Sequence, residues 1–346
     1  MNKKLMFFTF LFLILALCSF SLELNNGRIK LVLHKNSGRF SIYYLSDPEK
    51  RKYTSFFLDQ DVRTSLLSVV ANNKIYRLGE SGSFKEKIEE TAEGARFVWE
   101  SQQLEITEEF TFVTSSGANQ ADGVLISLSL KNITDSSINV GVRYLFDTYL
   151  GESHNHHFET NLHDNMKNET VIEKDSMITY WLSRNIKDEN VGLQMVTSGG
   201  NSTKPDKIIF ANWKRLNETT WTYLSSDSRD FSSRPYSIND SAVCHYYNPV
   251  SLGSGKQRKI SLLLGNMKEE GFATDETLPF DDEIFTLEPD EELQNQIKSD
   301  INVLESLLLM INKKIKSGDA VTDKDIAIME EILDEIKTRI KNYEDE

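Results

Sequence analysis

The chain has 346 residues, of which 53 are acidic and 39 basic, so its formal net charge is −14 at pH 7. The acidic residues are spread along the chain and no basic patch is visible, which makes nucleic acid and anionic membranes poor partners. A hydrophobic fraction of 39% in a chain of this length is enough to bury a sizeable core.

The N-terminal segment predicts export. Lys3 and Lys4 precede an apolar run over residues 5–17, which has the charge and length of a secretory signal core. The run is too short to span a bilayer as a helix, and no later segment resembles a membrane span. Small residues at positions 19 and 21 place the expected cleavage after Ser21. We therefore predict a signal peptide over residues 1–21 and a periplasmic or secreted mature protein.

Cys18 raises an alternative, because residues 15–18 have the outline of a bacterial lipoprotein cleavage site. The residue before a lipidated cysteine is normally small, so Leu17 makes a lipoprotein the less favoured interpretation. If Cys18 leaves with the signal peptide, Cys244 is the only cysteine of the mature sequence. An intramolecular disulfide is then impossible, and stability must come from the packed core.

From about residue 28 to 265 the sequence consists of short alternating or β-branched runs separated by turn residues, a pattern typical of antiparallel sandwiches and barrels. No strand alternates with a long amphipathic helix, which argues against a parallel α/β sheet. We predict a mainly β protein with one large antiparallel β-sandwich over residues 22–278. The expected strands are 28–34, 39–45, 65–71, 74–78, 95–100, 104–113, 123–130, 138–146, 192–196, 207–210, 241–247 and 258–264.

Residues 197–239 interrupt this pattern with a stretch rich in Ser, Asn, Thr and Asp that has only a short strand near Ile208. Long loops in compact domains tend to be functional or mobile. Trp213, Trp221 and Tyr223 lie here, followed by Tyr236. They predict either a platform on which a sugar stacks or a cover for the edge of the sandwich.

The region after about residue 282 has heptad periodicity, which predicts a C-terminal α-helical hairpin over residues 288–344. Leu304 and Leu308 belong to the apolar seam of the first helix, and Leu307 widens it. This helix face therefore packs on the β domain or docks to another protein.

The densest group of chemically reactive side chains follows the expected strand 138–146. Imidazole and carboxylate groups are suitable ligands for divalent metal ions. On an extended segment, alternate side chains point the same way, so two histidines completed by one carboxylate form a reasonable site. A solvated polar loop is the competing interpretation, since no H-E-x-x-H motif is present. The candidate ligands are Asp147, Glu152, His154, His156, His157 and His163.

Three single residues have both structural and chemical interpretations. Asp147 ends an apolar strand, so it acts as a base with a raised pKa or caps a turn. His245 alternates in phase with Val243 and Tyr247, which favours a sheet histidine over a catalyst. Cys244 then lies on the opposite face as a buried strand residue. Phosphate-binding loops and dinucleotide fingerprints are absent from the sequence, so no cofactor is predicted beyond a possible divalent ion.

Three segments resemble stretches of secreted and cell-envelope bacterial proteins with a galactose-mutarotase-like supersandwich: residues 140–151, 207–213 and 240–250, the last followed by a turn at Gly253. The resemblance covers roughly residues 22–265 and implies that fold. A mutarotase uses a histidine as acid and a carboxylate as base. No such pair aligns residue by residue here, so the resemblance leaves the activity open.

Together these features predict an exported, non-catalytic binding protein of the cell envelope that recognises a carbohydrate or an envelope protein. One alternative is a carbohydrate-active enzyme of mutarotase, glycosidase or lyase type, with a cleft lined by Asp147, Glu152 and the histidines. A structural component of a periplasmic assembly is the other alternative.

Overall fold

A computed structural model describes residues 21–185, 187–188, 190–199, 201–269, 271–274 and 322. The first 20 residues of the expected signal peptide, including Cys18, lie outside these ranges. The expected helical hairpin over 288–344 also lies outside them except for Thr322, so both remain predictions. Within the described residues no helix is both long and apolar enough to cross a membrane.

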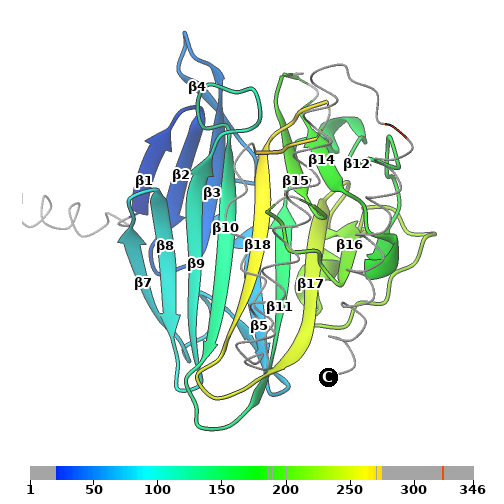
Figure 1. The fold of residues 1–346 in the computed structure, drawn as a ribbon. Coiled ribbons are helices and arrows are strands. Elements are labelled where there is room, and N and C mark those ends of the chain that lie inside the picture. Colours follow the sequence, from blue (N-terminus) through cyan, green and yellow to red (C-terminus); the bar gives the residue numbers. More distant parts are fainter. Residues whose placement is uncertain are drawn as a thin grey trace, which may run out of the picture. The chain divides into compact units, whose positions relative to one another are not determined.

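The described chain folds into three antiparallel sheets, which confirms the predicted β architecture (Figure 1). The four-stranded sheet has the order β1 (Ser21–Asn26), β2 (Ile29–His34), β3 (Arg39–Asp47), β4 (Lys52–Ser55). The eight-stranded sheet has the order β12 (Glu159–Thr160), β14 (Tyr180–Arg184), β15 (Gly192–Val196), β18 (Gln257–Asn266), β10 (Gly123–Asn132), β9 (Leu104–Val113), β8 (Gly94–Glu100), β7 (Lys85–Glu90). The six-stranded sheet has the order β13 (Thr170–Glu173), β16 (Lys207–Asn212), β17 (Ser241–Leu252), β11 (Ile138–Asp147), β5 (Leu66–Ala71), β6 (Lys74–Arg77).

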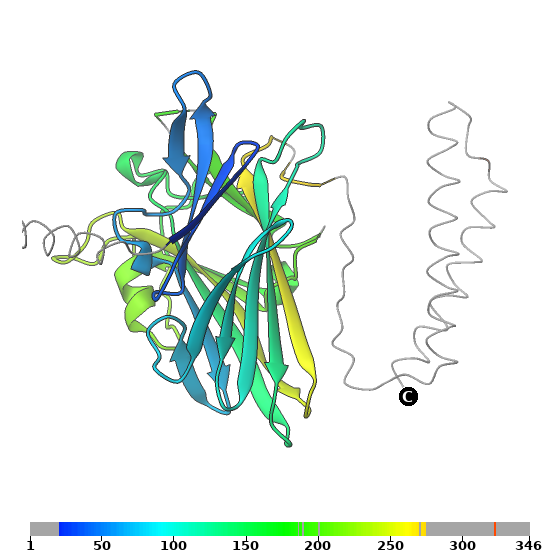
Figure 2. The ribbon, with the colours of Figure 1, turned by 90° about the vertical axis from the view of Figure 1, so that its left-hand side faces the viewer.

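Short helical turns connect some of these strands. They are η1 (Val62–Thr64), η2 (Glu152–His154), η3 (Lys174–Ser176) and α2 (Trp213–Glu218). In Figure 2 the blue strands of the four-stranded sheet lie toward the top of the view, and the turn ends of β10 and β18 lie at the bottom.

One apolar core takes side chains from all three sheets. Along β10, Val124, Ile126, Leu128 and Leu130 are all buried, as the period of two in a half-buried strand requires. Burying each such side chain contributes about 1.5–3 kcal/mol. Aromatic rings fill the space between the sheets, including those of Phe97, Trp99, Phe110, Tyr144 and Phe146.

The six-stranded sheet has a second buried face, which the sequence did not predict. Leu145, Ile209 and Cys244 lie on this face, covered by α2 and the segment 219–240. The prediction of a loop throughout this region was wrong for residues 213–218. The Asn212 side chain accepts a hydrogen bond from the Arg215 N–H and caps the helix. A helix of six residues is too short to show periodicity in a sequence.

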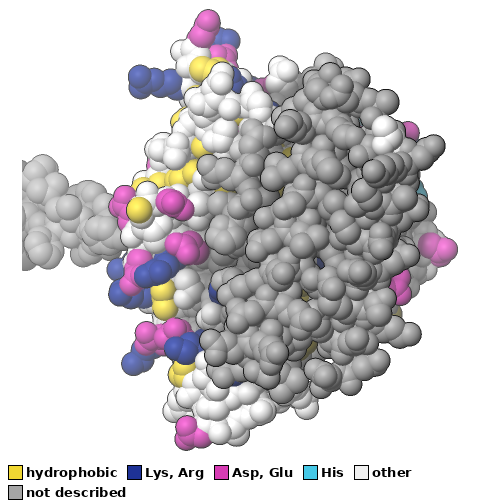
Figure 3. Space-filling view, in the orientation of Figure 1, with side chains coloured by type: hydrophobic (Ala, Val, Ile, Leu, Met, Phe, Trp, Pro, Cys, Tyr) yellow, Lys and Arg dark blue, Asp and Glu magenta, His cyan; other side chains and the backbone are white. Residues whose placement is uncertain are grey.

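Several strands were also missed: β1, β4, β7, β12, β13 and β14. β7 reads Lys-Glu-Lys-Ile-Glu-Glu and forms an edge of the eight-stranded sheet. Charged side chains suit an edge because they discourage pairing with another chain. Figure 3 shows acidic and basic side chains interspersed over the coloured part of the molecule. On β7 itself, Lys87 and Glu89 form an ion pair.

Candidate functional site

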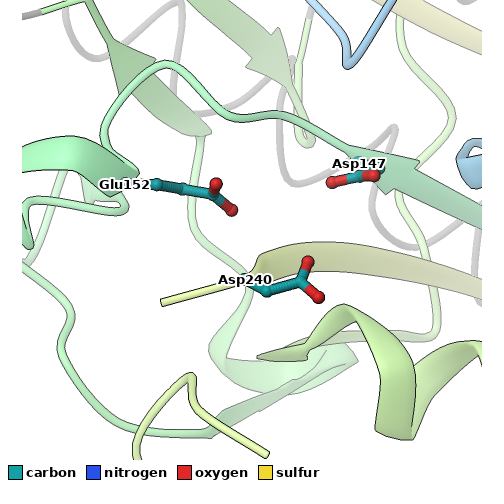
Figure 4. A group of neighbouring side chains, drawn as sticks. All are labelled: Asp147, Glu152 and Asp240. Carbon is teal, nitrogen blue, oxygen red and sulfur yellow. The ribbon is translucent and has the colours of Figure 1, made fainter. Parts of the chain in front are cut away.

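Three carboxyl groups meet where β11 ends and β17 begins. The two strands pair antiparallel with Asp147 opposite Ala242, so the last residue of β11 lies beside the start of β17. Asp240 immediately precedes β17, and Glu152 opens η2 just after β11. Oxygen atoms of Asp147, Glu152 and Asp240 all lie within 4.8 Å of one another. Figure 4 shows the three side chains directed toward a common space.

Backbone hydrogen bonds hold Asp147 and Asp240 in place. The Asp147 N–H donates to Ser65 Oγ at 3.0 Å, and the Asp147 carbonyl accepts from the Leu58 N–H at 3.0 Å. The Asp240 N–H donates to the Phe231 carbonyl at 3.1 Å, and the Asp240 carbonyl accepts from the Trp213 N–H at 2.8 Å. The positions of both carboxylates are therefore set by segments distant in sequence.

Glu152 is positioned by a close backbone approach at Gly151. A Cβ atom at Gly151 would lie 1.9 Å from the His156 carbonyl oxygen, so only glycine fits. The chain then folds back on itself, and the His156 N–H donates to the Gly151 carbonyl at 3.1 Å. The Glu152 carboxylate accepts a 2.7 Å hydrogen bond from the Ser241 N–H, which ties η2 to the start of β17.

Burial without a basic partner dominates the electrostatics of the site. Asp147 is 3% exposed, and its burial raises its pKa to about 7, with Asp240 and Asp61 adding to the rise. Burial likewise raises the pKa of Glu152 to about 8, opposed by the Ser241 N–H. The pKa of Asp240 is also raised by burial. No described Lys or Arg forms an ion pair with these three groups.

The cluster consequently retains protons close to neutral pH. Neighbouring carboxyl groups of this kind titrate as a coupled set, so the apparent pKa values belong to the cluster. A protonated member can donate and an ionised member can accept a proton at the same pH. Strongly raised carboxyl pKa values of this kind are concentrated at functional sites.

His157 lies beside this cluster through Ser241. The Ser241 Oγ atom is 2.8 Å from His157 Nδ1 and 3.3 Å from Glu152 Oε1. Asn155 Oδ1 lies 3.2 Å from the other ring nitrogen. Burial lowers the His157 pKa to about 4, so the ring is neutral at pH 7. It therefore supports the site as a neutral hydrogen-bonding group.

The other predicted histidine ligands do not converge. His154 is exposed and bonded to Ser153, His163 is exposed, and His156 Nε2 lies 3.1 Å from Glu159. The expectation of an extended segment was wrong, because residues 152–154 form η2 and Asn155 has a positive φ of 55°. The close approach at Gly151 imposes this turn.

A metal ion would find oxygen rather than nitrogen ligands here. Among the described residues, the group whose geometry suits a metal comprises Asp147, Glu152 and Asp240. Carboxylate oxygens are the ligands that hard divalent cations such as Ca²⁺ prefer. Two of the three were candidates from the sequence, and the histidines take no part in this group.

The four aromatic residues of the predicted platform lie in different environments in the structure. Trp213, Trp221 and Tyr223 are partly buried and pack against the second face of the six-stranded sheet. The Trp213 indole N–H donates to the Thr64 carbonyl at 2.9 Å, and the Trp221 ring meets Tyr246 edge-on. These contacts favour the covering role. Tyr236, in contrast, is 75% exposed.

His245 and Cys244 lie on opposite faces of β17, as predicted. Val243 and Tyr247 belong to the main core, and Cys244 belongs to the second buried face. The Trp181 indole N–H donates to His245 Nε2 at 2.9 Å, and burial lowers the His245 pKa to about 3. Burial raises the pKa of the Cys244 thiol. Both residues are placed in packed interiors.

Sequence reasoning missed Asp240 and Ser241 as members of the site. A signal for them existed, because the segments that resemble supersandwich proteins form β11, β16 and β17, three neighbouring strands. Asp147 lies within the first of these segments and Asp240 opens the last. Adjacency of the segments in one sheet would have suggested that the two carboxylates meet.

No protein-family model and no curated protein matches this chain. Among solved structures, it is similar to a putative aldose 1-epimerase from Escherichia coli K12, with a TM-score of 0.43 and 10% identity over 71% of this chain and 98% of that one. A galactose mutarotase-like protein from Lactobacillus casei ATCC 334 has a TM-score of 0.42 and 8% identity over 72% and 100%. A polysaccharide lyase has a TM-score of 0.39 and 9% identity, and the 72% of this chain that matches spans 34% of its length. The likeness is one of fold and does not identify a substrate.

Proposed function

We propose that this protein is a carbohydrate-active enzyme that transfers protons at a sugar by means of Asp147, Glu152 and Asp240. The observation that carries the proposal is the convergence of three carboxyl groups, two with pKa values raised to about 7 and 8. Such a cluster holds an acid and a base side by side at neutral pH. This replaces the non-catalytic binding protein as the favoured function.

The segments that carry the cluster are the reason for proposing a carbohydrate as the substrate. Residues 140–151 and 240–250 resemble mutarotase-like proteins. The first segment contains Asp147 and the second contains Asp240, whereas Glu152 directly follows the first segment. The resemblance alone did not indicate an acid–base pair. The structure supports the pairing by bringing these segments together at the paired ends of β11 and β17.

The simplest reaction for the cluster is opening of a cyclic sugar at its anomeric carbon. An ionised carboxylate removes the proton of the anomeric hydroxyl while a protonated carboxyl donates to the ring oxygen. The carbon–ring oxygen bond breaks, and the open-chain aldehyde forms with no net change in protons. Glu152 and Asp147, whose pKa values are raised to about 8 and about 7, share the roles of acid and base. Cleavage of a glycosidic bond uses the same acid on the bridging oxygen.

The test is to follow mutarotation of aldoses by polarimetry and release of reducing ends from polysaccharides, using wild-type protein, Asp147→Asn and Glu152→Gln. We expect each substitution to lower the rate about 10²–10⁴-fold. The wild-type rate should have a bell-shaped pH dependence with a maximum near neutrality. Asp164→Asn changes a nearby exposed carboxylate and should leave the rate unchanged.

Absence of turnover on every sugar tested would refute the proposed enzymatic activity. If glycans bound without turnover, the protein would be the binding protein that the sequence first suggested. Equal rates for wild type and Asp147→Asn would remove the carboxyl cluster from the mechanism.

A further inference from the structure

We propose that a second saccharide-binding site, distinct from the carboxyl cluster, lies in a cleft at the opposite end of β11 and accepts a neutral oligosaccharide. The cleft has a volume of about 640 Å³. This volume falls within the range of ligand pockets, about 300–1,000 Å³. Its lining residues are Ala71, Asn72, Lys74, Tyr76, Gly82, Ser83, Phe84, Ser101, Gln102, Gln103 and Leu104.

The cleft is separated from the acid–base site by most of the length of β11. Ala71, at the edge of the cleft, pairs with Val140 near the start of β11, whereas Asp147 ends that strand. Seven residues of extended chain span roughly 20 Å. A ligand in the cleft therefore does not touch the carboxyl cluster, and the two sites are independent.

Two turns from different sheets form the walls. One is the β5–β6 turn of the six-stranded sheet, in which Asn72 and Asn73 have positive φ values of 46° and 67°. The Asn72 side chain accepts from the Asn139 N–H at 2.9 Å. The other wall is the β8–β9 turn, where Ser101 Oγ accepts from the N–H groups of Gln103 at 3.2 Å and Leu104 at 3.0 Å. Both walls are held by hydrogen bonds, so binding would require little ordering of the backbone.

Two aromatic residues line the cleft. The rings of Tyr76 and Phe84 meet edge to face with centroids 5.3 Å apart. Both residues pack against the main core and remain partly exposed. Partly exposed aromatic rings beside polar lining residues suit a ligand with an apolar face and polar edges, and a sugar ring has this character.

The charge of the lining favours a neutral ligand. Its polar side chains are mainly amides and hydroxyls, and it contains no carboxylate although the protein as a whole carries −14. A cationic ligand would find no counter-charge there. Lys74 is the single charged residue of the lining, and its ammonium group lies over the Tyr76 ring at 4.8 Å. The exposed amides of Asn72, Gln102 and Gln103 offer donors and acceptors for many hydroxyl groups.

The experiment is isothermal titration calorimetry of the full-length mature protein with neutral hexasaccharides of glucose, xylose, mannose and N-acetylglucosamine. A hexamer of galacturonic acid serves as the anionic probe. We expect at least one neutral hexasaccharide to bind. Gln102→Ala combined with Gln103→Ala should weaken its binding about tenfold or more through lost hydrogen bonds. Phe84→Leu should weaken binding further, with thermal unfolding used to verify that the variant is folded.

Gln120→Ala is the matched control, because Gln120 is an exposed glutamine outside the cleft, and it should leave the affinity unchanged. Asp147→Asn should also leave binding in the cleft unchanged, which separates this proposal from the proposed activity. The proposal fails if no neutral hexasaccharide binds, if the glutamine double variant binds as tightly as wild type, or if only the anionic hexamer binds. Loss of binding in Asp147→Asn alone would assign the saccharide to the carboxyl cluster instead.

Discussion

The buried carboxylate of Glu169 and the carboxyl cluster of Asp147, Glu152 and Asp240 differ in what surrounds them. The Glu169 side chain has no exposed area, yet it forms ion pairs with Arg215 and Arg229, each with a nitrogen–oxygen distance of 2.7 Å. The Tyr223 hydroxyl and the Ser226 N–H also donate to it. The two ion pairs and these two hydrogen bonds compensate for the water that this carboxylate has lost. Glu169 thereby anchors the segment 219–240 on the second face of the six-stranded sheet.

Asp147 is buried and Glu152 is partly buried, and neither has such compensation. The donors around them are hydroxyl and backbone groups, and the charged neighbours that act on them are other carboxylates. Burial therefore raises the pKa values of these two carboxyl groups, because no ion pair with a described residue offsets the cost of removing their charge from water. The difference teaches that a buried acid with basic partners serves the fold, whereas a buried cluster of acids without them is a candidate for chemistry.

The largest effect should come from removing the charge at the compensated site. Glu169→Gln leaves Arg215 and Arg229 without their counter-charge, which should lower the free energy of unfolding by about 3 kcal/mol. Urea denaturation at pH 7 measures this loss. Glu173→Gln, at an exposed position on β13, should change it by less than about 0.5 kcal/mol. Equal losses in the two variants would contradict the structural role of Glu169.

The opposite sign is expected at the uncompensated site. The folded pKa of Asp147 is raised to about 7, so the folded state holds a proton that the unfolded chain releases near pH 4. The contribution of this group to stability is therefore fully present below about pH 4 and is lost as pH rises to 7. Asp147→Asn removes the penalty and should raise the free energy of unfolding at pH 8 by about 2 kcal/mol. Urea denaturation at pH 8 and pH 4 should show a gain only at the higher pH, and a loss at pH 8 would refute the argument.

A smaller effect with the reverse pH dependence is expected at His157. Its folded pKa is lowered to about 4, so the unfolded chain binds the proton first as pH falls below about 6.5. Its contribution is present above that pH and is lost on acidification toward pH 4. His157→Gln should flatten the decline in stability between pH 6.5 and 4 by about 1 kcal/mol. The His245 pKa is also lowered, so His245 contributes to the same decline, and the stabilities of wild type and His157→Gln must be compared at each pH. Parallel curves of unfolding free energy against pH for the two proteins would contradict the expectation.

The smallest effect is expected at Tyr236, in contrast with Trp221 of the same segment. Tyr236 is 75% exposed, so Tyr236→Ser should change the free energy of unfolding by less than about 0.5 kcal/mol. Trp221→Ala removes a partly buried ring and its edge contact with Tyr246, and it should cost more than about 1 kcal/mol. Thermal unfolding of both variants measures the difference. A large loss for Tyr236→Ser would mean that its ring also packs on the protein.

The strands that the sequence predicted are apolar or β-branched runs, whether they are buried on one face or on both. β10 carries buried apolar residues at every second position and β11 is buried on both faces, and both strands were found with nearly correct bounds. β7 was missed because its side chains are charged, as suits an edge strand. The short strands β12 and β13 have too few residues for a period to be visible. Their pairing partners, rather than their own residues, make them strands.

The candidate site was predicted in part. Asp147 and Glu152 were singled out because they follow an apolar strand in a dense group of ionisable residues. The histidines in that group were given a common direction that the turn at Gly151 does not allow. Asp240 was missed because it lies in a polar stretch and becomes part of the site only through the pairing of β17 with β11.

The sequence by itself determined the class of local structure, since a period of two in apolar residues is a property of each strand. It also determined which of Val243, Cys244 and His245 share a face, because alternation along a strand needs no partner. Only the tertiary structure decided which acids meet, which of them are compensated and which retain protons. The physical reason is that a pKa depends on burial and on the charges nearby, and both are set by segments far apart in the chain.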